Sequence, residues 1–369
     1  MVDKIFYRLT LVIALSLVSL SANASYTFNL LDMLGGTSSY AYGINDSGQI
    51  VGSITGANGT TRATLWSNGT TAYLDSLGGS YNTAIGINAS GQIGGIVSSA
   101  NGLQSAAIWS NGTLVTTGSS VMQWQGNVIN NAGQVVFTDY GNGGPKSATV
   151  WSNGIITNLS PLTGNSDSQA KAINNASQVV GSSFAGGVET ATLWSGGNAT
   201  ALAAVTGYSG SQARAINDSG LVVGESMKLT GIGLNTSGVA TLWSNGVAID
   251  LGTLGGTSKA NFINASGLIV GISHDESGNK IATLWDGTNI IDLNSFLDAN
   301  TVNAGWVLKK AYAISDNGWI VGTASNSLLG ITSQAFVLAA VPEVNTSFMF
   351  SMGLGLFCFM ACRRKITKA

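Results

Sequence analysis

Cysteine, histidine, proline and charge are all scarce in this chain of 369 residues, which has two cysteines, one histidine, three prolines and 9% charged residues. Both cysteines, Cys358 and Cys362, lie near the C-terminus. Residues 25–341 therefore have no disulfide framework, thiol nucleophile or cysteine-based metal site. The single histidine, His274, excludes a two-histidine metal site, and nothing matches a phosphate loop or a dinucleotide fingerprint. We predict no catalytic residue, metal or cofactor.

Residues 25–341 carry a small net negative charge. This segment holds nine Lys/Arg and fifteen Asp/Glu residues, so its formal charge is 9 − 15 = −6. A nucleic-acid partner would require a basic patch or stripe, and the sequence shows none. The polar surface must consist mainly of Ser, Thr, Asn and Gly, which suits an extracellular protein with hydrogen-bonding partners.

The N-terminal residues 1–24 have the pattern of a secretory signal peptide. Lys4 and Arg8 precede a twelve-residue apolar run at 9–20, and Ala22 and Ala24 provide the small residues of a cleavage site. The run is too short for a stable membrane span. The alternative is an uncleaved N-terminal anchor.

The C-terminal residues 341–369 have a different composition from the rest. Pro342 and Glu343 precede an apolar stretch at 347–361, and Arg363 and Arg364 follow it. This order resembles the PEP-CTERM sorting signal of Gram-negative bacteria, although Val344 stands where that family usually has a second proline. The resemblance implies an exosortase-like processing enzyme as a partner and a secreted or cell-surface location. The alternative is a plain transmembrane anchor whose basic end stays in the cytoplasm.

Two sequence marks repeat about every 43 residues between the two termini. An isoleucine that mostly precedes Asn recurs at Ile44, Ile87, Ile129, Ile173, Ile216, Ile263 and Ile314. A tryptophan recurs at Trp66, Trp109, Trp151, Trp194, Trp243 and Trp285, with Leu338 in the seventh place. Each unit contains four short strand-like segments, in the first unit about 40–44, 49–54, 62–66 and 71–74. Asn-Gly pairs such as Asn68-Gly69 favour a tight hairpin between the third and fourth segments of a unit.

Four antiparallel strands in each of seven units predict an all-β fold, a seven-bladed β-propeller over residues 25–340. The seventh unit stops after its third strand, and the segment at 26–31 precedes the first unit. We therefore expect segment 26–31 to complete the seventh blade and close the ring. The repeated tryptophan is interpreted as blade-to-blade packing, with ligand stacking as the alternative.

The units resemble the HAF repeats of bacterial extracellular proteins through "LGGTSSYAYGINDSGQIVG" and "RATLWSNG". That resemblance implies export and a repeat fold but no settled activity. The turn "NDSG" recurs in all seven units, with the acid often replaced. We interpret it as a structural corner rather than as a set of cation sites.

Function in propellers usually lies in the loops in which the blades differ. The most divergent connections between second and third strands are 225–238 and 274–280, which are expected to share one face with the "LGGT" crossovers. Shortening segment 225–238 is expected to leave the fold intact, since loop length costs little. The candidate ligand-binding residues are Glu225, Lys228, Asn235, His274, Asp275 and Glu276.

The sequence favours an exported, surface-associated, non-catalytic propeller that binds or scaffolds exopolysaccharide or surface proteins, and that meets the membrane only through its C-terminal tail. The alternatives are a polysaccharide-acting hydrolase or lyase on a propeller scaffold, and a purely structural matrix protein. Paired acids would be needed for glycoside chemistry, and the scattered acids single out no pair.

Overall fold

A computed structural model describes residues 26–118, 121–122, 128–140, 144–229 and 235–341. Residues 26–340 form one compact unit. In the described part of the chain, no helix is long and apolar enough to cross a membrane. The predicted signal peptide, the apolar stretch at 347–361 and the sorting residues Pro342, Glu343, Arg363 and Arg364 lie outside the described residues.

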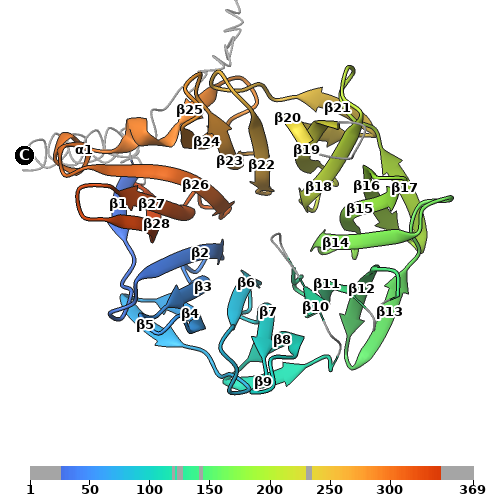
Figure 1. Cartoon of the computed structure of the whole chain (residues 1–369), viewed down its shortest axis with the longest axis horizontal. Helices are drawn as coiled ribbons and strands as arrows, with labels where there is room; N and C mark the ends of the chain where they lie inside the picture. The colour runs from blue at the N-terminus through green and yellow to red at the C-terminus, as the bar shows by residue number, and fades with distance from the viewer. Residues whose placement is uncertain (1–25, 119–120, 123–127, 141–143, 230–234, 342–369) are drawn as a thin grey trace, which may run out of the picture. The chain divides into compact units, whose positions relative to one another are not determined.

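The unit is a seven-bladed β-propeller of four-stranded antiparallel sheets arranged around one axis, as predicted (Figure 1). Blades 1 and 2 contain β2 (Ser38–Ile44), β3 (Ile50–Thr55), β4 (Thr61–Ser67), β5 (Thr70–Tyr73), β6 (Thr83–Ile87), β7 (Ile93–Ser98), β8 (Gln104–Ser110) and β9 (Thr113–Thr116). Blades 3 and 4 contain β10 (Val121–Met122), β11 (Val135–Asp139), β12 (Ser147–Ser152), β13 (Ile155–Leu159), β14 (Asp167–Ile173), β15 (Val179–Ala185), β16 (Val188–Ser195) and β17 (Asn198–Leu202). The innermost strands of these four blades are β2, β6, β10 and β14 (Figure 1).

Blades 5 and 6 contain β18 (Gly210–Ile216), β19 (Val222–Leu229), β20 (Asn235–Ser244), β21 (Val247–Asp250), β22 (Ser258–Ile263), β23 (Ile269–His274), β24 (Lys280–Trp285) and β25 (Ile290–Asp292). A short connection with η1 (Leu293–Phe296) and α1 (Ala299–Asn303) leads to blade 7, which contains β26 (Trp306–Ile314), β27 (Ile320–Asn326) and β28 (Ile331–Ala340).

The N-terminal strand β1 (Tyr26–Leu30) completes blade 7. It pairs antiparallel with β28, from Tyr26 opposite Ala340 to Leu30 opposite Phe336, and forms the outer strand of the sheet order β1-β28-β27-β26. Strands from the two ends of the propeller thus share one sheet. The predicted closure of the ring is confirmed.

The repeated tryptophans join neighbouring blades. Trp66 of blade 1 packs in one cluster with Ala313, Val321 and Val337 of blade 7. Its indole N–H donates to the carbonyl oxygen of Asp32, just after β1, at 2.8 Å. Trp109, Trp194 and Trp243 repeat this bond to the preceding blade at 2.7–2.9 Å. Burying one such side chain contributes roughly 4–6 kcal/mol, so the tryptophans are a main source of blade-to-blade cohesion.

The recurrent corner after the innermost strand has a second role besides reversing the chain. Its asparagine accepts, through Oδ1, the backbone N–H four residues later, as Asn45 does from Gln49 at 3.1 Å. The same side chain donates from Nδ2 to the backbone carbonyl of the equivalent residue in the next blade, at 3.0–3.1 Å. These donors are Asn45, Asn88, Asn130, Asn174, Asn217 and Asn264, which we call the asparagine ring.

Blade 7 departs from the ring because Ser315 occupies the asparagine position. The hydroxyl oxygen of Ser315 accepts the backbone N–H of Trp319 at 3.1 Å, as the asparagine Oδ1 atoms do in their own turns. Serine has no amide that could reach blade 1. The junction keeps the backbone bond that other junctions also have, here Asp316 N–H donating to Asp46 Oδ1 at 2.8 Å, and adds Asn317 Nδ2 donating to the Asp46 carbonyl at 2.9 Å.

Ser315→Asn is expected to add the seventh link by placing an amide donor toward the Asn45 carbonyl. A net gain of about 0.5–1.5 kcal/mol in the free energy of unfolding is expected for one such hydrogen bond. Urea denaturation measures it, and Asn174→Ser, which removes an existing link, should shift stability in the opposite direction. A destabilising Ser315→Asn would contradict the role assigned to the asparagine ring.

Candidate functional site

Each described innermost strand longer than two residues contains a β-bulge near the axis. The register against the second strand shifts between Ala41 and Gly43 in blade 1 and between Ala213 and Ala215 in blade 5, and at the equivalent place in blades 2, 4, 6 and 7. The residue inside the shift has no partner opposite it in the ladder. Bulges re-aim such side chains, here toward the axis. These residues are Tyr42, Ile85, Lys171, Arg214, Asn261 and Tyr312.

The residues two positions before the bulge also differ between blades, and in blade 1 this residue, Tyr40, stacks on the bulge residue Tyr42. They are Tyr40, Thr83, Gln169, Gln212, Lys259 and Lys310. We call both sets together the axial residues. The residues on either side of each bulge are Ala or Gly, except Phe262, and pack between blades. Gly43 shows why they are small: an added Cβ would lie only 3.0 Å from the carbonyl oxygen of Ile85. The axial positions themselves differ in chemistry from blade to blade.

Tyrosines gather on one side of the axis. Tyr40 stacks on Tyr42 with ring centroids 5.8 Å apart, and Tyr42 meets the edge of Tyr312 of blade 7 at 5.1 Å. Burial, followed by the neighbouring Tyr312 and Tyr81, raises the pKa of Tyr42 well above its usual value. Tyr42 therefore stays neutral at physiological pH, and the tyrosine cluster offers ring faces and hydroxyl groups.

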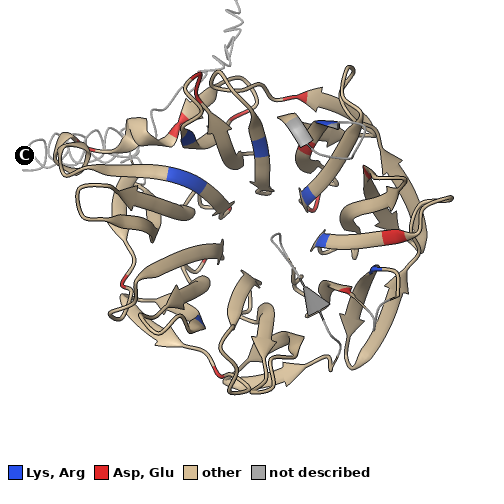
Figure 2. Ribbon diagram, in the orientation of Figure 1, with Lys and Arg blue, Asp and Glu red and all other residues tan. Residues whose placement is uncertain are grey.

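Basic residues gather on the other side of the axis. Five of the nine Lys/Arg residues in 25–341 lie on innermost strands, namely Lys171, Arg214, Lys259, Lys309 and Lys310, whereas Asp167 is the one acid there among the described residues. Figure 2 shows this basic colouring on β14, β18, β22 and β26, the innermost strands of blades 4–7. A domain of net negative charge thus concentrates positive charge beside its axis.

Glu225 is the buried acid in this group. Its carboxylate accepts from Arg214 at 2.8 Å and lies 3.0 Å from the Lys259 ammonium of blade 6. Burial alone would raise the pKa of Glu225, but the charges of and hydrogen bonds from Arg214 and Lys259 outweigh it and lower the pKa below its usual value. Glu225 is therefore ionised at neutral pH and joins blades 5 and 6.

Lys171 is buried, with 7% of its surface exposed, and forms no ion pair among the described residues. Burial, followed by repulsion from Arg214, lowers the pKa of Lys171 to about 8, although Glu189 and Glu225 act in the opposite direction. On the other flank, burial and then repulsion from Lys280 and Lys259 lower the pKa of Lys310. At both lysines, repulsion from neighbouring cations adds to the effect of burial, and the nearby acids do not cancel the lowering of the pKa.

The turn face carries a shallow depression of about 160 Å³ around the axis. Its rim includes Asp46, Asp218 and Asp316, whose carboxylates accept backbone N–H groups from adjacent blades at 2.8–2.9 Å. Asn131 makes the same bond, which explains why Asp and Asn exchange freely there. The volume lies below the roughly 300–1,000 Å³ of typical ligand pockets.

Phe262 of blade 6 forms part of the apolar floor of this depression. It also lines the small space beside Tyr42 and Ile85 of blades 1 and 2, so its ring reaches across the axis. The side chain thereby separates the turn-face depression from the axial residues. Among the described residues no group of three or more His, Cys, Asp or Glu is arranged to hold a metal ion.

The divergent connections do lie on the face of the "LGGT" crossovers: the backbone N–H of Thr37 bonds Thr55, and that of Gly256 bonds His274. The assignment of Glu225 to a loop, however, was wrong. Glu225 lies within β19 and is 1% exposed, because Arg214 and Lys259 draw its carboxylate inward. The hairpin strands run to Leu229 and resume at Asn235, so replacing 225–238 would remove paired strand and a buried charge. On these grounds we now expect the replacement to destabilise blade 5, in place of the expectation that the fold would survive it.

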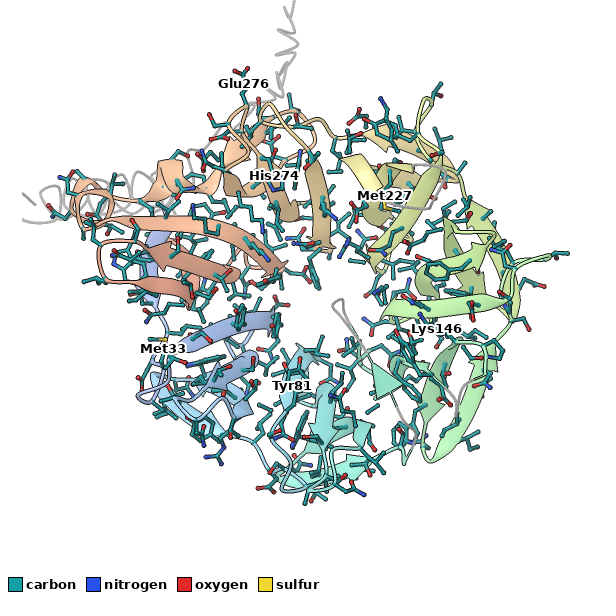
Figure 3. The ribbon with its side chains drawn as sticks, viewed as in Figure 1. Met33, Tyr81, Lys146, Met227, His274 and Glu276 are labelled. Atoms are coloured by element: carbon teal, nitrogen blue, oxygen red, sulfur yellow. The ribbon has the colours of Figure 1, made fainter. Side chains whose placement is uncertain are left out.

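The remaining candidates are dispersed. The exposed Lys228 lies in β19 with its ammonium 5.5 Å from the Tyr208 ring centroid, and Asn235 begins β20. His274 ends β23, and its Nδ1 lies 2.9 Å from the Thr257 hydroxyl. Asp275 accepts two hydrogen bonds from Asn279, which lower its pKa. Glu276 points outward at the rim of blade 6 (Figure 3). The side chains of Lys228, His274, Asp275 and Glu276 contact different groups and do not form one cluster.

The axial residues are the functional candidates that the sequence analysis missed. A signal was present in the repeats, because the residues two and four positions before each repeated isoleucine vary in chemistry while their neighbours stay small. Their proximity across blades could not be derived from one repeat alone.

Comparison with known proteins supports the fold. The chain matches the β-propeller domain of the trilobed protease from Pyrococcus furiosus, which has an open velcro topology, at 9% identity and a TM-score of 0.55, covering 82% of this chain and 95% of that one. It matches Pyrococcus horikoshii acylaminoacyl peptidase at 9% identity and a TM-score of 0.53, covering 84% of this chain and 52% of that one, so it spans about half of that peptidase.

Aleuria aurantia lectin matches at 13% identity and a TM-score of 0.39, covering 73% of this chain and 95% of the lectin. No protein-family model and no curated protein sequence matches the chain. At these identities the likeness shows the fold alone: this is a seven-bladed β-propeller.

Glu225→Gln is expected to destabilise the propeller by roughly 3 kcal/mol, because Arg214 and Lys259 would face each other without a carboxylate. Since the folded-state pKa of Glu225 is lowered, its stabilisation is present above the unfolded pKa of about 4.3 and is lost as pH falls through the folded pKa. Urea melts between pH 3 and pH 7 should show a smaller acid loss in the variant. The matched control, Glu276→Gln on the exposed rim, should change stability by less than about 0.5 kcal/mol. Equal effects of the two substitutions would contradict the ion-pair role.

Thermal melts of residues 25–341 with and without a chelator are expected to coincide, because blade cohesion in the described residues comes from tryptophan packing and hydrogen bonds between turns. Circular dichroism at 218 nm measures the transition. A large drop in melting temperature with the chelator would reveal an oxygen-ligand calcium site.

Proposed function

We propose that this protein is an exported, surface-associated β-propeller that binds or scaffolds extracellular polysaccharide or surface proteins without catalysing a reaction. The observation that carries the proposal is the set of axial residues: tyrosine rings, amides and cations held on paired strands, at positions whose chemistry differs from blade to blade. Rigid scaffolds with variable polar and aromatic groups are suited to recognition.

The proposal includes export by the signal peptide at 1–24 and delivery to the surface of a Gram-negative bacterium through the PEP-CTERM-like tail. An exosortase-like enzyme would recognise Pro342, Glu343 and the basic end at Arg363 and Arg364. The HAF-like repeats are consistent with this setting. The surface rich in Ser, Thr, Asn and Gly that the composition predicts also suits contact with hydrated polymers.

A polysaccharide-acting hydrolase or lyase is the main alternative. A glycosidase of the usual kind needs one carboxylic acid with a raised pKa to protonate the leaving group. The buried acid beside the axis, Glu225, has the opposite property, because two cations keep it ionised. This charge arrangement favours binding over glycoside hydrolysis. The other alternative, a purely structural matrix role, would leave the variation of the axial residues between blades unexplained.

A glycan array probed with residues 25–341 tests the proposal. We expect binding to at least one class of bacterial polysaccharide, with no new reducing ends and no unsaturated products after prolonged incubation. Chain cleavage would support the enzyme alternative. If no glycan binds and a surface protein is captured specifically, the partner of the scaffold is a protein rather than a polysaccharide.

A further inference from the structure

We propose that the axial residues of blades 4–7 bind the carboxylate groups of an acidic sugar, so that the polymer recognised is a uronate-bearing polysaccharide. This inference rests on the proposed function, since it names the class of glycan. It uses two separate features of the described residues: uncompensated positive charge on one side of the axis and tyrosine surfaces on the other.

The charge balance near the axis carries the first step. The innermost strands of blades 4–7 and the charged groups beside them supply six positive charges, from Lys171, Arg214, Lys259, Lys280, Lys309 and Lys310, and three negative ones, from Asp167, Glu189 and Glu225. The arithmetic, 6 − 3, leaves an excess of three positive charges. Glu225 is already shared by Arg214 and Lys259, and Glu189 accepts a hydrogen bond from Gln212 at 2.6 Å. An anion at Lys171 or Lys310 would relieve repulsion that the protein itself leaves in place.

The structural setting of Lys171 is the second step. A buried ammonium without an ion pair is costly, and proteins rarely keep one without a use. The bulge between Ala170 and Ala172 holds Lys171 at the axial edge of β14. Arg214 occupies the same bulge position in the next blade, which places two cations side by side. Carboxylates bind such cations through short charge-assisted hydrogen bonds.

The tyrosines identify the rest of the ligand as a sugar. Tyr42 stacks on Tyr40 and meets the edge of Tyr312. Tyr312 is buried, so the accessible ring surface comes from the half-buried Tyr40 and from Tyr81, which is 40% exposed. Aromatic faces pack against the C–H faces of sugar rings, and phenol hydroxyls exchange hydrogen bonds with sugar hydroxyls. A small inorganic anion would use the cations but would have no use for these surfaces. An acidic sugar uses both.

Affinity of the full-length chain for oligogalacturonate and for its carboxyl-reduced, neutral form tests the assignment by calorimetry. We expect binding of the acidic form, weaker binding of the neutral form and a marked loss in 0.5 M NaCl, because salt screens exposed charges. Lys171→Gln and Lys310→Gln should each weaken binding of the acidic form about tenfold, the loss expected for one charge-assisted hydrogen bond.

Arg62→Gln is the matched control, since it removes one positive charge from an exposed position on β4, where Arg62 lies over the Tyr73 ring 3.9 Å from its centroid. It should leave affinity unchanged. Thermal melts check that each variant is folded, and having two lysine variants on different blades keeps the test valid if one of them is unstable.

The outcomes separate the two proposals. Binding of acidic and neutral oligomers with equal affinity, or wild-type affinity in both lysine variants, would overturn the uronate assignment and leave the polysaccharide-binding function standing. Preference for dextran sulfate over oligogalacturonate would overturn the carboxylate in favour of a sulfated polymer. Failure to bind any glycan, acidic or neutral, would overturn the uronate assignment and the polysaccharide branch of the proposed function, and would leave surface proteins as its partners.

Discussion

The side-chain amide of the turn asparagine is the interaction on which the propeller depends most directly. One group satisfies two requirements, because Oδ1 closes the turn of its own blade and Nδ2 reaches the backbone of the next. Neither aspartate nor serine can replace it fully, since one lacks the amide donor and the other lacks the length. A blade is thus fixed locally and in the ring by the same residue, so folding of the turn and docking of the blades are coupled.

The tryptophans add a second connection at greater distance from the axis. Their indole N–H groups reach carbonyls that follow the outer strand of the preceding blade. Hydrogen bonds near the axis and packing farther out therefore hold each blade at two radii. This arrangement fixes the angle between blades, and it positions the axial side chains of adjacent blades within reach of each other.

The sequence could predict the blade number, the four-stranded units and the closing strand, because each depends on patterns within about 43 residues. The location of Glu225 could not be predicted in that way. Its position after an apolar run looks like the end of a strand, and its burial depends on Arg214 on the neighbouring strand and on Lys259 in the next blade. The axial cluster of Lys171 with Arg214 is hidden for the same reason: residues 43 apart meet only when the ring closes.

The bulges in the innermost strands separate recognition from architecture. A side chain inside a register shift has no partner opposite it in the ladder, so its replacement leaves the strand pairing as it was. Some of these side chains also touch the neighbouring blade, as Tyr42 does with Tyr312 and as Asn261 does with the Ala311 carbonyl. Related chains could thus acquire different ligand preferences through a few point changes, each coupled mainly to the adjacent blade. In this sense the fold is a fixed frame holding a ring of interchangeable contacts.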